Sequence, residues 1–152
     1  MQLLQRVVVG AIVVPATLAS VGLAAHPAPA VPPGQLVFAV RSSEIVLAGT
    51  AGSARERQEV VDAVRALSAA HRITDLITPG TGERLPVPPA VAARLLGAVL
   101  DRGVTDFTGV VHEGHLTASA RVADPERAGS LSDALRTAAP GLRVDEDFTT
   151  TG

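Results

Sequence analysis

Two histidines lie close together in the segment His112-Glu113-Gly114-His115, and paired imidazoles can form half of a metal site. The glycine favours a tight turn, which would place the two rings on either side of it. A third ligand would have to come from elsewhere in the chain, and the helical spacing of the zinc proteases is absent. Because a polar hairpin turn explains the segment equally well, we predict no metal site here and no cofactor.

Three consecutive carboxylates, Asp145, Glu146 and Asp147, are the other concentrated group of titratable side chains. A carboxylate pair can perform acid–base chemistry or bind a cation only if both members point into one cleft. In a strand, alternation sends Asp145 and Asp147 to one side and Glu146 to the other. The run therefore indicates a solvated sheet edge.

Hydroxyl and glycine motifs give no stronger sign of catalysis. Ser42, Ser43 and Ser53 have no histidine and aspartate at a recognisable spacing for a hydrolase triad. The segment Gly80-Thr81-Gly82 lacks the third glycine of a phosphate loop and its strand-to-helix setting. The chain has no cysteine, which excludes thiol chemistry and disulfides. We expect that the protein is not an enzyme, and we assign no catalytic, cofactor-binding or metal residue.

The elements that carry these side chains occur twice. The stretch Asp62–Thr78 recurs at Asp133–Thr149, an offset of 71 positions (133 minus 62) without a gap. Such a repeat indicates two copies of one small unit, neither of which can bury its apolar face alone. The identical pairs are Asp62/Asp133, Ala63/Ala134, Arg65/Arg136, Arg72/Arg143 and Thr78/Thr149.

Each copy is predicted to run strand, strand, helix, strand. Capping signals at Ser53 and at Asp124-Pro125 start the two repeat helices. Their inward residues are predicted as Val60, Val61, Val64 and Leu67 in the first, and Leu131 and Leu135 in the second. The predicted strands are 36–40, 44–49 and 72–78, then 107–111, 115–122 and 142–148. A linking helix is predicted over 90–101, with Leu95, Leu96 and Leu100 inward and Gly103 as its stop.

The fold class follows from the alternation along His115–Val122, where Leu116, Ala118 and Ala120 are separated by polar residues. Such alternation means that one side of the sheet meets water. We therefore predict an α+β fold with one six-stranded mixed sheet and three helices on one face. The domain boundaries are 1–25 for an N-terminal membrane segment, 26–34 for a proline-rich linker, 35–79 and 105–150 for the two copies, and 80–104 for the connector and linking helix.

The N-terminal segment contains nineteen uncharged residues, Val7–Ala25, which can just cross a bilayer core of roughly 30 Å. A cleaved signal peptide is the competing interpretation, with Ala28-Pro29-Ala30 as a weak cleavage site. The length favours a retained anchor, with Arg6 on the cytoplasmic side and the domain outside. The spacer His26–Gly34 has four prolines in nine residues and favours an extended polyproline conformation.

Composition narrows the choice of partner. Charged residues are 18% of the chain and the formal net charge is -2, so no strong field favours nucleic acid. The only three aromatic residues among Phe, Trp and Tyr are Phe38, Phe107 and Phe148, which we expect in the core, so the usual stacking platform for single strands is missing. All thirteen cations are arginine, a bias typical of GC-rich coding such as that of actinobacteria.

Several motifs resemble the BON domain, a small module of bacterial envelopes. They are a strand ending in Leu47-Ala48-Gly49-Thr50, a capped helix with Asp62-Ala63-Val64-Arg65, and a closing strand that ends near Ile77. With the membrane segment Val-Val-Gly-Ala-Ile-Val-Val-Pro and the proline-rich spacer, the layout is similar to the N-terminal part of the mycobacterial outer membrane protein A family, which is also described as channel-forming. The sequence shows no counterpart of that family's C-terminal OmpA-like domain, so its anchoring role is not carried over.

The resemblance implies a single-pass protein of the cell membrane that contacts membrane lipid or an envelope protein, or forms a homo-oligomer. A channel-forming or transport-associated protein is the alternative. The arginines spread through the repeats argue against a barrel built by the domain itself, because a barrel needs an apolar lipid-facing band. A pore would instead need several copies of the Val7–Ala25 helix. These arginines are Arg65, Arg72, Arg136 and Arg143.

Overall fold

The chain folds into alternating strands and helices after its N-terminal segment. The computed structural model describes residues 31, 32, 34–80 and 84–151, so the predicted membrane segment and most of the linker lie outside the described residues. No helix in the described part is long and apolar enough to span a bilayer. The elements are β1 (Gln35–Arg41), β2 (Glu44–Thr50), α2 (Ala54–Arg65), β3 (Arg72–Thr78), α3 (Pro89–Asp101), β4 (Asp106–His112), β5 (His115–Val122), α4 (Pro125–Ala138) and β6 (Arg143–Thr150).

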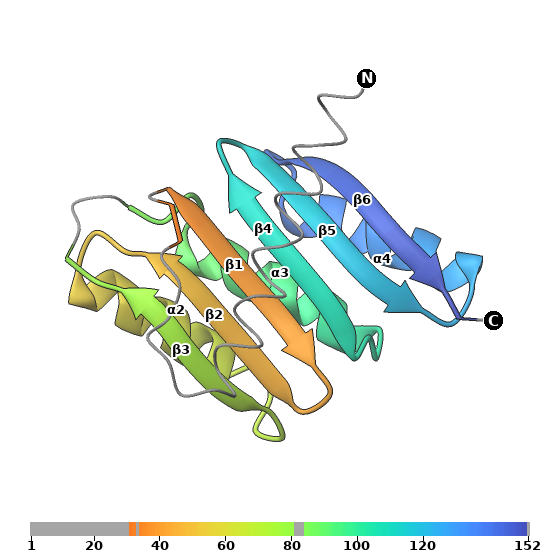
Figure 1. Ribbon diagram of the computed structural model, residues 1–152, viewed down its shortest axis with the longest axis horizontal. Coiled ribbons are helices and arrows are strands. Elements are labelled where there is room, and N and C mark those ends of the chain that lie inside the picture. Colours follow the sequence, from red (N-terminus) through yellow and green to blue (C-terminus); the bar gives the residue numbers. More distant parts are fainter. Residues whose placement is uncertain (1–30, 33, 81–83, 152) are drawn as a thin grey trace.

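The strands form one mixed sheet in the order β3-β2-β1-β4-β5-β6. The β1–β2, β1–β4 and β4–β5 pairs are antiparallel, while β2–β3 and β5–β6 are parallel. Figure 1 shows α2, α3 and α4 together on one face of this sheet. The predicted α+β class, with a six-stranded mixed sheet and three helices, is confirmed.

The internal repeat is visible in the positions of the elements. β1, β2, α2 and β3 begin at residues 35, 44, 54 and 72, and β4, β5, α4 and β6 begin at 106, 115, 125 and 143, which is 71 later in every case. The two copies meet where β1 pairs with β4. In that ladder Phe38 faces Gly109, and these two residues are themselves repeat equivalents (109 minus 38 is 71). A local two-fold axis therefore passes between Phe38 and Gly109.

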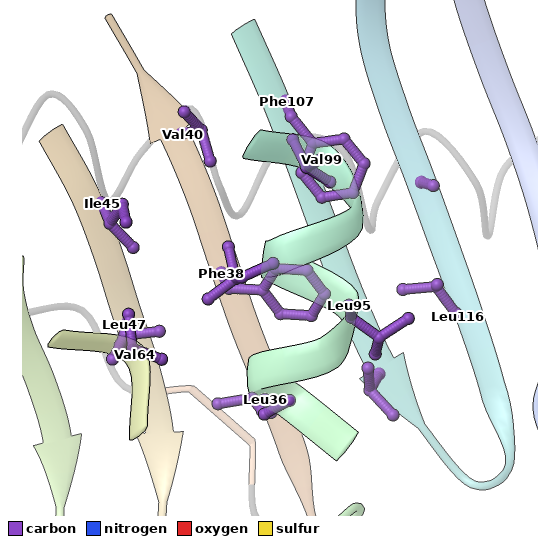
Figure 2. Close-up of a cluster of buried hydrophobic side chains, with 14 of the residues drawn as sticks. Leu36, Phe38, Val40, Ile45, Leu47, Val64, Leu95, Val99, Phe107 and Leu116 are labelled. Carbon is purple, nitrogen blue, oxygen red and sulfur yellow. The ribbon is translucent and has the colours of Figure 1, made fainter. Parts of the chain in front are cut away.

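The linking helix α3 fills the space beneath this junction. Leu95 and Val99 of α3 are buried against the sheet beside Phe38 and Phe107, as Figure 2 shows. The two phenylalanine rings stack with their centroids 5.8 Å apart and their planes at 27°. Leu95 and Leu96 are buried as predicted, and Leu100 packs partly buried at the margin of the core. α3 thus supplies the apolar contacts that the two copies share.

Local capping signals predicted the helix ends. The Ser53 hydroxyl accepts a hydrogen bond from the Glu56 backbone N–H at 3.1 Å, and the Asp124 carboxylate accepts one from the Arg127 N–H at 2.8 Å. Gly103 follows α3 with a φ of 65°, the left-handed conformation that ends helices most readily at glycine. Each cap satisfies a backbone group that the helix itself leaves unpaired.

One predicted core position is wrong. Val60, Val61 and Val64 of α2 are buried, but Leu67 is 38% exposed. The helix ends at Arg65, and beyond that point the 3.6-residue period no longer determines where a side chain lies. Leu67 instead borders a hollow between the helices.

Glu56 connects α2 to the connector before α3. Its Oε1 atom accepts hydrogen bonds from the backbone N–H of Gly52 at 2.9 Å and from that of Leu85 at 3.0 Å. Glu56→Ala would leave both donors without this acceptor, so we expect the free energy of unfolding to fall by about 1–3 kcal/mol. Urea denaturation followed by circular dichroism measures the change. Glu56→Gln keeps an acceptor oxygen and should lose clearly less; equal losses would contradict the hydrogen-bonding role.

Candidate functional site

The two histidines of the predicted hairpin turn lie opposite each other at the start of the β4–β5 ladder. His112 Nδ1 is 3.2 Å from the Gly34 carbonyl oxygen, and its Nε2 is 3.8 Å from a Glu113 carboxylate oxygen. His115 Nδ1 is 3.8 Å from an Asp145 carboxylate oxygen. In the described part of the chain, no three histidine or acidic side chains come together as a metal site would require. The histidines are therefore occupied by local polar contacts at the sheet end.

The acidic run divides between the two faces of β6, as alternation predicts. Glu146 points to the helices, where its Oε1 is 2.8 Å from Arg136 Nη2 and accepts a hydrogen bond from the Ser132 hydroxyl. Arg136 also donates to Ser132. Asp145 lies near His115 on the opposite face. These carboxylates do not share a cleft, so the run has the arrangement expected of a solvated edge with one structural ion pair.

The serines and the glycine segment are also placed by local structure. Ser42 and Ser43 form the tight turn between β1 and β2, and Ser53 is the cap of α2. The Ser42 backbone N–H donates to the Thr105 carbonyl at 2.8 Å. Gly80 has a φ of 78°, and the next three residues lie outside the described part. The structure thus brings none of these serines together with the histidines.

One face of the six-stranded sheet carries no helix (Figure 1). Alternate residues of each strand point there, while their neighbours enter the core against the helices. Val37, Ala48 and Val110 form an apolar cluster of their own on this face, separate from the main core. This helix-free face is the candidate functional surface, and it has three distinct parts.

One end of the helix-free face is charged. Cross-strand neighbours alternate in sign, since Glu44 pairs with Arg72 and Arg41, and Arg41 also pairs with Asp106. Opposite charges in directly facing positions stabilise a sheet modestly. The sequence reading missed this row because its members lie in four different strands, and only the strand order places them side by side.

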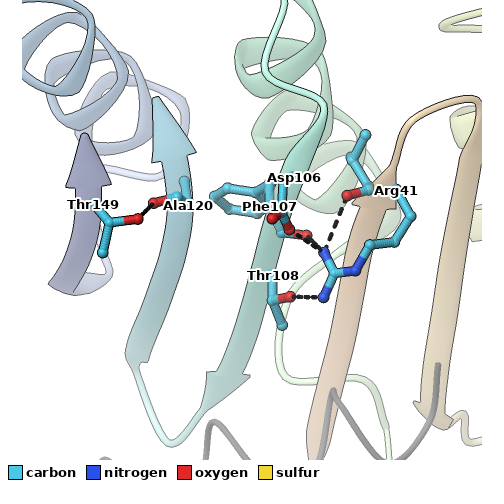
Figure 3. Close-up of polar contacts among 7 residues, drawn as sticks. Arg41, Asp106, Phe107, Thr108, Ala120 and Thr149 are labelled. Atoms are coloured by element: carbon cyan, nitrogen blue, oxygen red, sulfur yellow. Dashed lines mark hydrogen bonds and ion pairs between the residues drawn. The ribbon is translucent and has the colours of Figure 1, made fainter. Parts of the chain in front are cut away.

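Arg41 ties the two copies together at this end. Its Nη1 atom is 3.0 Å from the Asp106 carboxylate and donates to the Phe107 carbonyl at 2.9 Å, while Nη2 donates to the Thr108 hydroxyl at 2.8 Å (Figure 3). It also donates to the Val40 carbonyl. Asp106, Phe107 and Thr108 all lie in β4. A guanidinium with several acceptors is held in one orientation, so its role is to fix the β1–β4 junction.

An apolar patch occupies the first copy's half of the helix-free face and extends onto β4 of the second copy. We use this name for Val37, Ala39, Val46, Ala48, Leu76 and Val110, which are neighbours across β3, β2, β1 and β4. The second copy's half is polar and open to water. There Val110 is followed across the strands by Thr117 of β5 and then by Asp145 of β6. The patch is the feature of this face that requires an explanation, because it lies opposite the helices that cover the main core.

Hollows also lie on the helix side of the part of the chain that the structure describes. One, of about 670 Å³, lies between the end of α3 and the start of α4, where Arg102 donates to the Ser130 hydroxyl and carbonyl at 3.1 Å. Another, of about 570 Å³, is lined by Leu67 and by small and charged residues of α3 and α4, among them Gly97 and Arg94. Arg94 donates to the Ala138 carbonyl and Arg102 to Ser130, so these two arginines are engaged in structural contacts. A small-molecule site is usually a cleft or cavity with a few convergent polar groups.

Comparison with known proteins assigns the chain to no family. No family model matches the chain, and no curated protein matches it.

Proposed function

We propose that this protein is a single-pass protein of the cell membrane that displays a non-enzymatic binding module on the extracytoplasmic side. The observation that carries the proposal is the order of the segments along the chain. The uncharged run Val7–Ala25 is followed at once by a proline-rich spacer and then by a domain that fills its own core. Inserting such a run into a bilayer avoids the cost of a central charge, about 2.5–3.5 kcal/mol per residue.

The module is a tandem BON-like unit, and its partner is membrane lipid or another envelope component. Further copies of the chain are a partner of the same kind. The polar half of the helix-free face supports this proposal, because Thr117, Ser119 and Asp147 belong to the second copy and none of them is needed by the core. A flat, polar and open surface of this kind suits contact with a large partner better than enclosure of a small molecule.

The distribution of reactive side chains supports a binding role over an enzymatic one. The acidic side chains Asp145 and Glu146 point to opposite faces, and the latter is paired with Arg136. Ser53 caps a helix. Acid–base or nucleophilic catalysis needs such groups within hydrogen-bond reach of one substrate.

A channel-forming or transport-associated protein is the alternative. The domain has helices on one face and charged side chains in its strands, so it would not present the apolar band of a barrel to lipid. A pore would therefore consist of several Val7–Ala25 helices. Conductance across planar bilayers that survives deletion of the domain would favour this alternative.

Membrane retention is the prediction that tests the proposal. We expect protein from the native envelope to keep Met1 or Gln2 at its N-terminus and to stay with membranes after high-salt and carbonate washing. Edman sequencing identifies the N-terminus, and the amount of protein in the washed membrane fraction measures the retention. Ala16→Arg, which places a charge in the middle of the run, should reduce retention, whereas Gln5→Arg lies outside the run and should not. A mature start near Val31 in a soluble fraction would overturn the anchor and with it any helix-bundle pore.

A further inference from the structure

The two copies differ on the helix-free face and agree on the helix side. The inward positions match in kind between the copies, apolar in Leu36/Phe107 and Ile45/Leu116 and acidic in Asp75/Glu146. Four outward positions are apolar in the first copy and polar in the second, while the outward pair Ala39/Val110 is apolar in both. Since both copies adopt the same fold, the fold does not require this outward apolarity, and a cover over the first copy explains it. The outward pairs that differ are Val37/Thr108, Val46/Thr117, Ala48/Ser119 and Leu76/Asp147, each 71 positions apart.

The low exposure of the patch residues also indicates a cover over the first copy. Val37 is 1% exposed, Ala48 is 0% exposed and Val110 is 8% exposed, although all three lie on the face that α2, α3 and α4 do not reach. Val31, which precedes β1, packs against this cluster. The first described residue of the chain therefore already contacts the patch.

A tight turn directs the chain before β1 back over the sheet. The Gln35 backbone N–H donates to the Pro32 carbonyl at 3.3 Å, and Gly34 has a φ of 79°. A hydrogen bond over this span reverses the chain, and a glycine with positive φ is its usual third residue. The turn thus places Val31 on the helix-free face, against the patch.

We propose that the spacer residues His26–Ala30 continue from Val31 across the apolar patch and cover it as a strap. Six residues of polyproline conformation, His26–Val31, span about 19 Å at about 3.1 Å per residue. The patch runs across four neighbouring strands, about 14 Å at about 4.8 Å between strands, so the strap is long enough to cross it. Proline has no N–H, so a proline-rich strap buries few unpaired donors on an apolar surface.

Thr50 offers the strap a polar contact. It is 9% exposed, it lies in β2 two residues beyond Ala48, and its hydroxyl has no hydrogen-bond partner among the described residues. A buried hydroxyl without a partner is unusual in folded proteins. The carbonyl groups of an extended strap have no partner within their own segment and can accept this hydrogen bond.

The strap does not depend on membrane anchoring, but it changes what the spacer does. A free proline-rich spacer would let the domain move at the end of its tether. A spacer packed on the first copy instead fixes the domain relative to residue 26, and it leaves the second copy's polar face as the open half of the sheet.

The test uses the absence of cysteine from the chain, which allows one thiol to be placed at will. In the full chain we expect the thiol of Ala48→Cys to react with an uncharged maleimide at least about tenfold more slowly than that of Ser119→Cys, its repeat equivalent. Replacing residues 26–30 by Gly-Ser-Gly-Ser-Gly should raise the Ala48→Cys rate and leave the Ser119→Cys rate unchanged. Val46→Cys with Thr117→Cys provides a second matched pair if Ala48→Cys does not fold.

Oxidative cross-linking tests the occupant directly. Ala28→Cys with Ala48→Cys should form an intramolecular disulfide, and Ala28→Cys with Ser119→Cys should not. Equal reactivity of the two single thiols in the full chain would overturn the strap. So would protection that survives the Gly-Ser replacement, whether it rises with protein concentration, which indicates a second copy, or appears only with lipid vesicles, which indicates a bilayer.

Discussion

Val64→Asp should abolish the cooperative folded state of the domain. Val64 is 0% exposed in α2 and packs in the main core, so a carboxylate there would be buried without a partner. The cost is several kcal/mol, against a total stability of about 5–15 kcal/mol for a domain. Leu135→Asp, at the position 71 residues later, should have the same effect because Leu135 is equally buried in α4. Thermal unfolding followed by circular dichroism measures both.

Gln58→Asp is the matched control, since it adds the same side chain to an exposed position of α2 and loses only a solvent-exposed hydrogen bond to Asp62. It should change the free energy of unfolding by less than about 1 kcal/mol. Arg57 is less suitable as a neutral site, because its Nε is 2.8 Å from the Asp75 carboxylate of β3. If Gln58→Asp were as damaging as Val64→Asp, the buried face of α2 would be assigned wrongly.

Local signals explain why the sequence predicted most elements. The serine and glutamate of Ser53-Ala54-Arg55-Glu56 act within one helical turn, and both hydrogen bonds they accept near α2 are present. Glu113 and Gly114 both have positive φ in the β4–β5 turn, as a two-residue hairpin requires. Such features depend on neighbours in the chain and on no distant contact.

The order of the strands was not predictable in the same way. The sequence does not say that β1 pairs with β4, because that pairing depends on the competition among strand edges and not on any local motif. The charged row through Arg41 depends on this strand order, so the sequence did not predict it. The ion pairs of β3 and β6 with the helices were not predicted either. Asp75 and Glu146 are repeat equivalents, yet their partners are Arg57 and Arg136, which are not.

The outward difference between the copies could have been found from the sequence. The offset of 71 places Ala48 beside Ser119 and Leu76 beside Asp147 in an alignment of the two halves. What was missing was the knowledge of which positions face outward. The alternation in β5 gave this for the second copy, but in β1 and β2 nearly every residue is apolar, so periodicity could not separate the two faces.

The local two-fold axis places a strict demand on Gly109. A Cβ atom at this position would lie 2.7 Å from Cζ and 2.8 Å from Cε2 of Phe38, and 3.1 Å from Cε1 of Phe107. Both rings are fully buried. Phe38 and its repeat equivalent Gly109 face each other at the axis, and there is room for only one aromatic ring between them. The first copy supplies Phe38, and the second copy leaves the space empty.

Gly109→Ala should therefore lower the free energy of unfolding by about 1–3 kcal/mol, as overpacking of a filled core does. Gly129→Ala is the matched control, since a Cβ atom there meets nothing within 4 Å and the position is inside α4. The same substitution should stabilise that helix by about 0.5–1 kcal/mol, because alanine loses less backbone entropy than glycine. Chemical denaturation of both variants measures the change in the free energy of unfolding, which should be negative for Gly109→Ala and positive for Gly129→Ala.

In a Phe38→Leu background the smaller side chain makes room at the axis, so Gly109→Ala should cost clearly less there than in the parent chain. An undiminished cost would mean that the clash lies with the backbone, and that Phe38 does not set the requirement for glycine.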